Sequence, residues 1–137
     1  MDGWNTLQRI KEQINTVFIS KGELINQILI ALISEGHLLL EDVPGVGKTT
    51  LVIALSKAID SDFGRIQFTP DTLPSDVLGV SIYNAKTAEF KYMPGPIMHQ
   101  ILLADEINRT SPKTQSGLLE AMEERQVTVD GVVYPLK

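Results

Sequence analysis

The sequence predicts an α/β fold with a parallel sheet, because two short apolar runs are separated by helical patterns and glycine-rich turns. The runs at residues 37–40 and 101–104 are typical of parallel strands that are covered on both faces. Around them, apolar residues recur at the three- to four-residue spacing of amphipathic helices. Strand, loop and helix units in this order build a parallel sheet flanked by helices.

The first part of the chain predicts helices on both sides of the first strand. Apolar residues recur at helical spacing over residues 7–18, and a wider apolar stripe covers residues 24–33. Gly36 is expected to end the second helix, and residues 37–40 to form the first strand. After a glycine-rich turn, a third helix is expected from residue 48 to about residue 59.

The middle of the chain predicts a second strand and a hairpin. Residues 65–68 alternate like a strand, and Pro70 and Pro74 are loop signals that follow it. Residues 81–83 and 90–92, joined by a polar turn, predict an antiparallel hairpin added outside the core.

The last part of the chain predicts a third strand, a helix and a second hairpin. The strand is the apolar run at residues 101–104, and Ser111 and Pro112 suit the start of the helix that follows. Asp130 and Gly131, between two short β-prone runs, are a strong two-residue hairpin signal. The expected inner stripe of the helix consists of Leu118, Leu119 and Met122.

Length and composition predict one compact domain, since the chain has 137 residues of which 43% are hydrophobic. The net charge of −5, with 12 scattered Lys and Arg residues, excludes a basic surface for nucleic acid or for an anionic membrane. The absence of cysteine excludes disulfides, thiolate metal ligands and cysteine nucleophiles. The polar start and the lack of an apolar stretch of about 20 residues predict a cytoplasmic location without membrane insertion.

The strongest functional signal lies between the first predicted strand and the third predicted helix. Glycines there allow backbone N–H groups to converge on phosphates, and a helix N-terminus adds a partial positive charge. Lys48 can reach the β- and γ-phosphates of ATP, and the Thr49 hydroxyl can bind Mg²⁺. Asp42 stands where the strict pattern has glycine, and the alternative is an ordinary glycine-rich loop. The predicted ATP-binding residues are Asp42, Val43, Pro44, Gly45, Val46, Gly47, Lys48, Thr49 and Thr50.

Two carboxylates follow the apolar run at residues 101–104, at the strand end where parallel sheets bind ligands. Asp105 is expected to hold Mg²⁺, mostly through water, and Glu106 to polarise the water that attacks the γ-phosphate. Alone, the pattern also fits a strand that runs into a solvated turn, but the phosphate loop upstream favours the functional interpretation. The predicted catalytic residues are Glu106 and Lys48, and the predicted metal ligands are Thr49 and Asp105.

With these motifs the chain resembles the MoxR branch of the AAA+ ATPases. The resemblance implies a P-loop NTPase with a three-layer α/β/α parallel sheet in the spatial order 5-1-4-3-2. Residues 1–137 would be the N-terminal portion of that core, ending after the third core strand and the following hairpin, with strands four and five and the lid beyond it. The resemblance is carried by residues 39–51, 65–79, 94–96 and 102–129.

The resemblance further implies Mg²⁺-dependent ATP hydrolysis by a ring hexamer, driving chaperone-like remodelling or assembly of a protein partner. The implied partner is a protein with a von Willebrand factor A-like domain, and both hairpins would project toward the pore of the ring. The isolated chain is expected to hydrolyse ATP weakly or not at all. Two alternatives stay open, namely a magnesium-chelatase-type ATPase subunit and a nucleotide-binding interaction module without hydrolysis. Arg109 is open too, as a charge sensor in the ring or a surface ion-pair partner.

Overall fold

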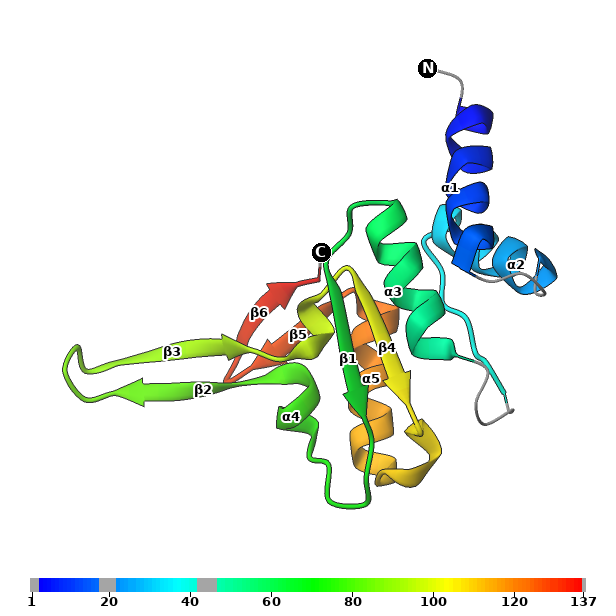
Figure 1. Ribbon diagram of the computed structural model, residues 1–137. Coiled ribbons are helices and arrows are strands. Elements are labelled where there is room, and N and C mark those ends of the chain that lie inside the picture. The colour runs from blue at the N-terminus through cyan, green and yellow to red at the C-terminus, as the bar shows by residue number, and fades with distance from the viewer. Residues whose placement is uncertain (1–2, 18–21, 42–46, 137) are drawn as a thin grey trace. The chain divides into compact units, whose positions relative to one another are not determined.

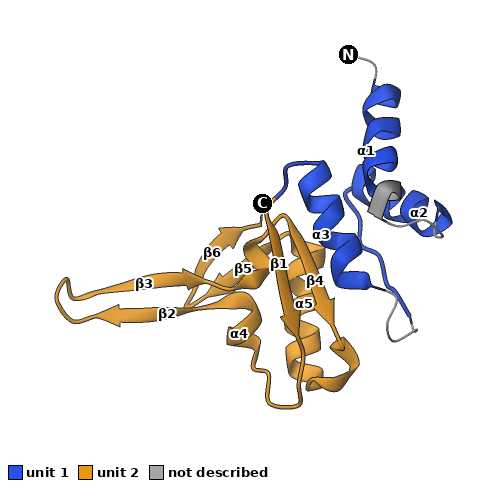
Figure 2. Ribbon diagram, in the orientation of Figure 1, with its two compact units in different colours: residues 1–61 blue, residues 62–137 orange. Residues whose placement is uncertain are grey.

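The computed structural model describes residues 3–17, 22–41 and 47–136, and the chain divides into two compact units. The first unit covers residues 1–61 and the second covers residues 62–137 (Figure 2). None of the described helices is long and apolar enough to cross a lipid bilayer.

The first unit consists of three helices, α1 (Gly3–Val17), α2 (Gly22–Ile33) and α3 (Lys48–Ala58), and all three were predicted (Figure 1). Helix α1 contacts both α2 and α3. Their apolar stripes face one another, so this small core is built from the i, i+3, i+4 pattern that the sequence displays. The buried apolar side chains are those of Ile14, Ile25, Ile28, Leu29, Leu51, Val52 and Leu55.

The strand predicted at residues 37–40 does not form, and this prediction was wrong. Residues 36–41 have no regular secondary structure, and the side chain of Leu39 is 73% exposed. A strand exists only through hydrogen bonds to a neighbour, and no ladder in the described part of the chain includes this segment. In the sheet order that the resemblance implies, the two neighbours of this strand are strands four and five.

The second unit is built on two parallel strands, β1 (Phe63–Gln67) and β4 (Ile101–Asp105). Phe63 lies opposite Ile101 and Gln67 lies opposite Asp105, which confirms the parallel pairing of the second and third predicted strands. Pairing continues one residue further, because the Phe68 N–H donates to the Asp105 carbonyl at 2.9 Å. The core beside this pair is formed by Phe68, Val77, Ile97, Leu118, Ala121 and Val127.

Helix α5 (Pro112–Glu124) covers this core and begins as predicted. The Ser111 hydroxyl accepts a hydrogen bond from the Thr114 N–H at 3.3 Å, which makes Ser111 the N-cap. Leu118 is buried, but Leu119 is 57% exposed, so its predicted place in the inner stripe was wrong. Leu119 lies about 100° around the helix from Leu118, and Ala121, one turn on from Leu118, is buried instead.

Both predicted hairpins are confirmed, as β2 (Gly79–Asn84) with β3 (Glu89–Pro94) and β5 (Gln126–Val129) with β6 (Val132–Pro135). Asp130 and Gly131 have φ values of 50° and 78°, as a two-residue turn with both residues left-handed requires. The β2–β3 hairpin extends away from the rest of the second unit (Figure 1). Three short helices complete this unit, α4 (Pro74–Leu78), η1 (Pro96–Met98) and η2 (Ile107–Arg109).

The base of the β2–β3 hairpin is anchored by close backbone contact and by one tyrosine. Gly79 has a φ of 99°, and a Cβ atom added to it would lie 2.5 Å from the Met93 carbonyl oxygen. The Tyr92 hydroxyl donates to the Leu78 carbonyl, and the Tyr92 ring stacks on Tyr134 with 3.9 Å between centroids. Burial raises the pKa of the Tyr92 hydroxyl above its ordinary value. The hairpin is therefore fixed in direction where it leaves α4.

Candidate functional site

The first unit holds one candidate site, the start of helix α3. Gly47 precedes the helix with φ 66° and ψ 33°, a left-handed conformation that favours glycine. The Leu51 N–H donates to the Gly47 carbonyl at 2.9 Å, which is the first hydrogen bond of the helix. The N–H groups of Lys48, Thr49 and Thr50 precede that bond, and Gly47 has no side chain to cap them. This end of α3 therefore presents N–H donors that Gly47 leaves without a side-chain cap, together with the positive end of the helix dipole.

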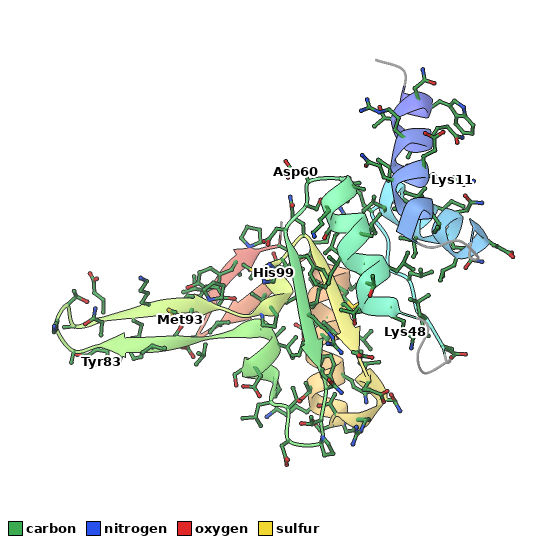
Figure 3. All side chains as sticks on the ribbon, viewed as in Figure 1. Lys11, Lys48, Asp60, Tyr83, Met93 and His99 are labelled. Carbon is green, nitrogen blue, oxygen red and sulfur yellow. The ribbon has the colours of Figure 1, made fainter. Side chains whose placement is uncertain are left out.

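Lys48 and Thr49 lie in the first turn of α3, and both are half-buried. Figure 3 shows Lys48 at this turn of the helix. An ammonium group, a hydroxyl and the N–H groups of a helix N-terminus together suit a polyphosphate and its metal ion. The predicted residues Asp42, Val43, Pro44, Gly45 and Val46 lie outside the described residues.

The second unit holds another candidate site, the carboxyl end of β4. Asp105 is the last residue of the strand, and its side chain is 26% exposed. The Arg65 Nη2 atom lies 2.9 Å from Asp105 Oδ2, and the Arg65 side chain is 41% exposed. Arg65 stands on β1, two residues before the partner of Asp105 in the register, so both side chains lie on one face of the strand pair.

Glu106 ends the strand in an uncommon backbone conformation. It has φ 57° and ψ 38°, which is left-handed and costs a residue with a Cβ atom roughly 1–2 kcal/mol. Its carbonyl accepts a hydrogen bond from the Arg109 N–H at 2.9 Å, which closes the turn η2, and its side chain is exposed. Non-glycine residues in such conformations concentrate at functional sites.

Two threonines fix the segment that follows the carboxylates. The hydroxyls of Thr110 and Thr114 both donate to the carbonyl oxygen of Thr72, at 3.2 Å and 2.9 Å. Thr72 belongs to the loop after β1, so these bonds tie that loop to the loop after β4 and to the first turn of α5. Both threonines are buried, and the Gln115 side chain donates to the Thr110 carbonyl at 3.1 Å. The carboxylates therefore stand on a loop that its neighbours hold in place.

The structure thus brings Asp105, Glu106 and Arg65 together at one sheet edge, while Lys48 and Thr49 belong to the other unit. Sequence reasoning missed Arg65 as a partner of Asp105, and it missed the threonine contacts. The sequence offered one signal for the Arg65 contact, namely a basic residue in a strand that was expected to pair with β4. No periodic pattern in the sequence marks the two threonines.

Comparisons with known proteins identify relatives of the whole described region. The family model described as "ATPase family associated with various cellular activities (AAA)" matches residues 37–137. The protein YeaC of Bacillus subtilis, named as uncharacterized, is 68% identical over 91% of this chain and 39% of its own length. Chaperone MoxR1 of Mycobacterium tuberculosis is 42% identical over 96% of this chain and 35% of its own length.

A solved structure agrees with these relatives. A crystal structure from Cytophaga hutchinsonii, of a protein classed provisionally as an ATPase, is 45% identical with a TM-score of 0.86. The match covers 97% of this chain and 40% of the solved one. The chain therefore spans about two fifths or less of the length of the relatives it matches.

Proposed function

The chain belongs to the AAA family of ATPases, in its MoxR branch, and from this membership we propose that the protein hydrolyses ATP with Mg²⁺ to remodel or assemble a protein partner. The observation that carries the proposal is the start of α3. There a left-handed Gly47 precedes Lys48 and Thr49 and gives the first N–H groups of the helix no side-chain cap. This arrangement suits a triphosphate, because it offers backbone donors, a helix dipole and one ammonium group together.

The proposed nucleotide-binding residues are those of the loop and the first turn. Backbone N–H groups of residues 45–50 would surround the phosphates, and Lys48 would neutralise the β- and γ-phosphates. Charge-assisted contacts of this kind are roughly twice as strong as neutral hydrogen bonds. Asp42, Val43 and Pro44 complete the proposed segment on its N-terminal side.

The donor set of the chain fits Mg²⁺. This ion prefers oxygen ligands and is usually held by one or two carboxylates or hydroxyls together with substrate phosphates. Thr49 and Asp105 are the proposed ligands, and Asp105 is the last residue of β4 with its side chain 26% exposed. When bound, Mg²⁺ would offset negative charge on the phosphates.

Glu106 is proposed to orient and polarise the attacking water. Its exposed carboxylate follows Asp105 directly, and the left-handed backbone takes it out of the strand. A carboxylate within hydrogen-bond reach of the water can accept its proton, a contribution typically of 10²–10⁴-fold. Ring assembly as a hexamer and a partner with a von Willebrand factor A-like domain complete the proposal, and both come from the family resemblance.

The test is single-turnover phosphate release from ATP by the full-length protein. Wild-type protein is expected to release phosphate only when Mg²⁺ is present. Tight ATP binding without phosphate release would refute hydrolysis and favour a nucleotide-binding interaction module. A magnesium-chelatase-type subunit would hydrolyse ATP as well, so capture of the protein partner is needed to distinguish it.

A further inference from the structure

Asp105 is paired with a cation that belongs to the chain itself. The contact of 2.9 Å between Arg65 Nη2 and Asp105 Oδ2 is both a hydrogen bond and an ion pair. The register places Arg65 opposite Leu103 and Gln67 opposite Asp105, so the long arginine side chain reaches diagonally across the two strands. The pair lies at the strand end where the proposed metal ion would approach.

This ion pair contributes little to holding the two strands together. Both side chains are partly exposed, at 41% for Arg65 and 26% for Asp105, so water and salt screen their attraction. The strands are already joined by a parallel ladder over five residue pairs, from Phe63 with Ile101 to Gln67 with Asp105. The contact therefore acts mainly on Asp105 itself, by affecting the charge and the orientation of its carboxylate.

We propose that Arg65 is a positioning residue that holds the Asp105 carboxylate and keeps Mg²⁺ from binding there until a nucleotide brings the metal. This inference rests on the proposed function, in which Asp105 is a metal ligand. A free Mg²⁺ ion meets a carboxylate that already pairs with a guanidinium, and the positive charge of that group repels the ion. Mg²⁺ bound to ATP arrives with the negative charge of the triphosphate, which offsets that repulsion.

Arg65 need not leave when the metal arrives. A carboxylate has two oxygens and about four acceptor positions, so a bond at Oδ2 leaves capacity for a water of the metal shell. The arginine thereby fixes the carboxylate orientation that the loaded site uses. The result is a site that is selective for the metal–nucleotide complex over the free ion.

The test uses Mn²⁺ as a probe, because the free ion is measured directly by electron paramagnetic resonance. Full-length wild-type protein is expected to bind Mn²⁺ well only when ADP or ATP is present. Arg65→Gln should bind Mn²⁺ without nucleotide about tenfold more tightly than wild type, because a positive charge that repels the ion is removed. Adding Asp105→Asn to this variant should abolish the gain.

Matched variants separate this role from a structural one. Lys91→Gln removes the same charge from β3 and should leave Mn²⁺ binding unchanged, while Arg65→Lys keeps the charge and should stay near wild type. Arg65→Met keeps the aliphatic stem and is the second charge-removing variant if Arg65→Gln does not fold. A purely structural arginine would change the melting temperature in these variants without changing Mn²⁺ affinity.

Two failures have different meanings. Equal nucleotide-free Mn²⁺ affinity in wild type and Arg65→Gln, with ATP still bound by both, would overturn the role of Arg65 and leave the proposed function standing. Failure of the wild-type protein to bind ATP in the presence of Mn²⁺ would overturn the proposed function itself.

Discussion

Replacing single glycines with alanine should change stability in opposite directions, depending on the backbone and on the space around each Cβ position. Gly79 combines φ 99° and ψ 174° with a Cβ position 2.5 Å from the Met93 carbonyl oxygen and 2.7 Å from the Gly95 nitrogen. The backbone region is nearly exclusive to glycine and costs alanine about 1–3 kcal/mol. Overlap with backbone atoms, which cannot rotate away, adds about 1–3 kcal/mol. Gly79→Ala should therefore lower the free energy of unfolding by roughly 2–6 kcal/mol.

Two other glycines provide the controls for the same substitution. Gly131 has φ 78° but no atom within 4 Å of the Cβ position, so Gly131→Ala should lose only the backbone strain, about 1–2 kcal/mol. Gly117 lies inside α5, where the nearest atom to an added Cβ is Leu78 Cδ1 at 3.5 Å. Gly117→Ala should therefore raise stability by about 0.5–1 kcal/mol, through helix propensity.

Urea unfolding of the 137-residue chain, followed by far-UV circular dichroism, measures all three changes as shifts of the midpoint at constant slope. Equal losses for Gly79→Ala and Gly131→Ala would refute the argument from crowding at the hairpin base. A loss in Gly117→Ala would show that the space beside α5 is smaller than the structure gives.

Further predictions concern the proposed site and its support. Lys48→Ala should weaken ATP binding roughly ten- to a hundredfold in calorimetry, since one charge-assisted contact of roughly 1.5–3 kcal/mol is lost, while Lys57→Ala, later on the same helix, should have no effect. Glu106→Gln should retain ATP binding but reduce single-turnover phosphate release about a hundredfold or more, and normal turnover would remove Glu106 from the mechanism. Glu106→Gly should also stop hydrolysis, yet relieve backbone strain of roughly 1–2 kcal/mol, so that in urea unfolding it is more stable than Glu106→Gln. Thr114→Val should lower the free energy of unfolding by about 1–3 kcal/mol, because a buried hydrogen bond to the Thr72 carbonyl is lost.

Elements specified by local sequence were predictable. The turn at Asp130 and Gly131 shows why, since the dipeptide itself favours the left-handed conformations that the hairpin needs. Ser111 likewise carries its own capping oxygen to the start of α5. The helices were predictable for the same reason, because the spacing of apolar residues is itself local. Leu119 shows the limit of this pattern, since it is exposed although its neighbour Leu118 is buried.

Features that depend on distant partners were not predictable. Residues 37–40 have a strand-like composition, but composition supplies no partner, and no ladder in the described part of the chain includes them. The Arg65–Asp105 pair joins residues 40 positions apart, and it follows from a register that neither strand specifies alone. The bonds from Thr110 and Thr114 to Thr72 depend in the same way on two loops meeting in space.

The left-handed backbone at Glu106 explains how two consecutive acids can serve two purposes. In a continued strand, Asp105 and Glu106 would point to opposite faces of the sheet. Because Glu106 has φ 57°, the strand ends there, and the two carboxylates acquire different surroundings at one edge. Asp105 is partly buried and paired with Arg65, as suits an acid that holds a cation, whereas Glu106 is exposed and accessible to water. Different environments are what give neighbouring carboxylates different roles, so the strain at Glu106 is the structural condition for the proposed division of labour.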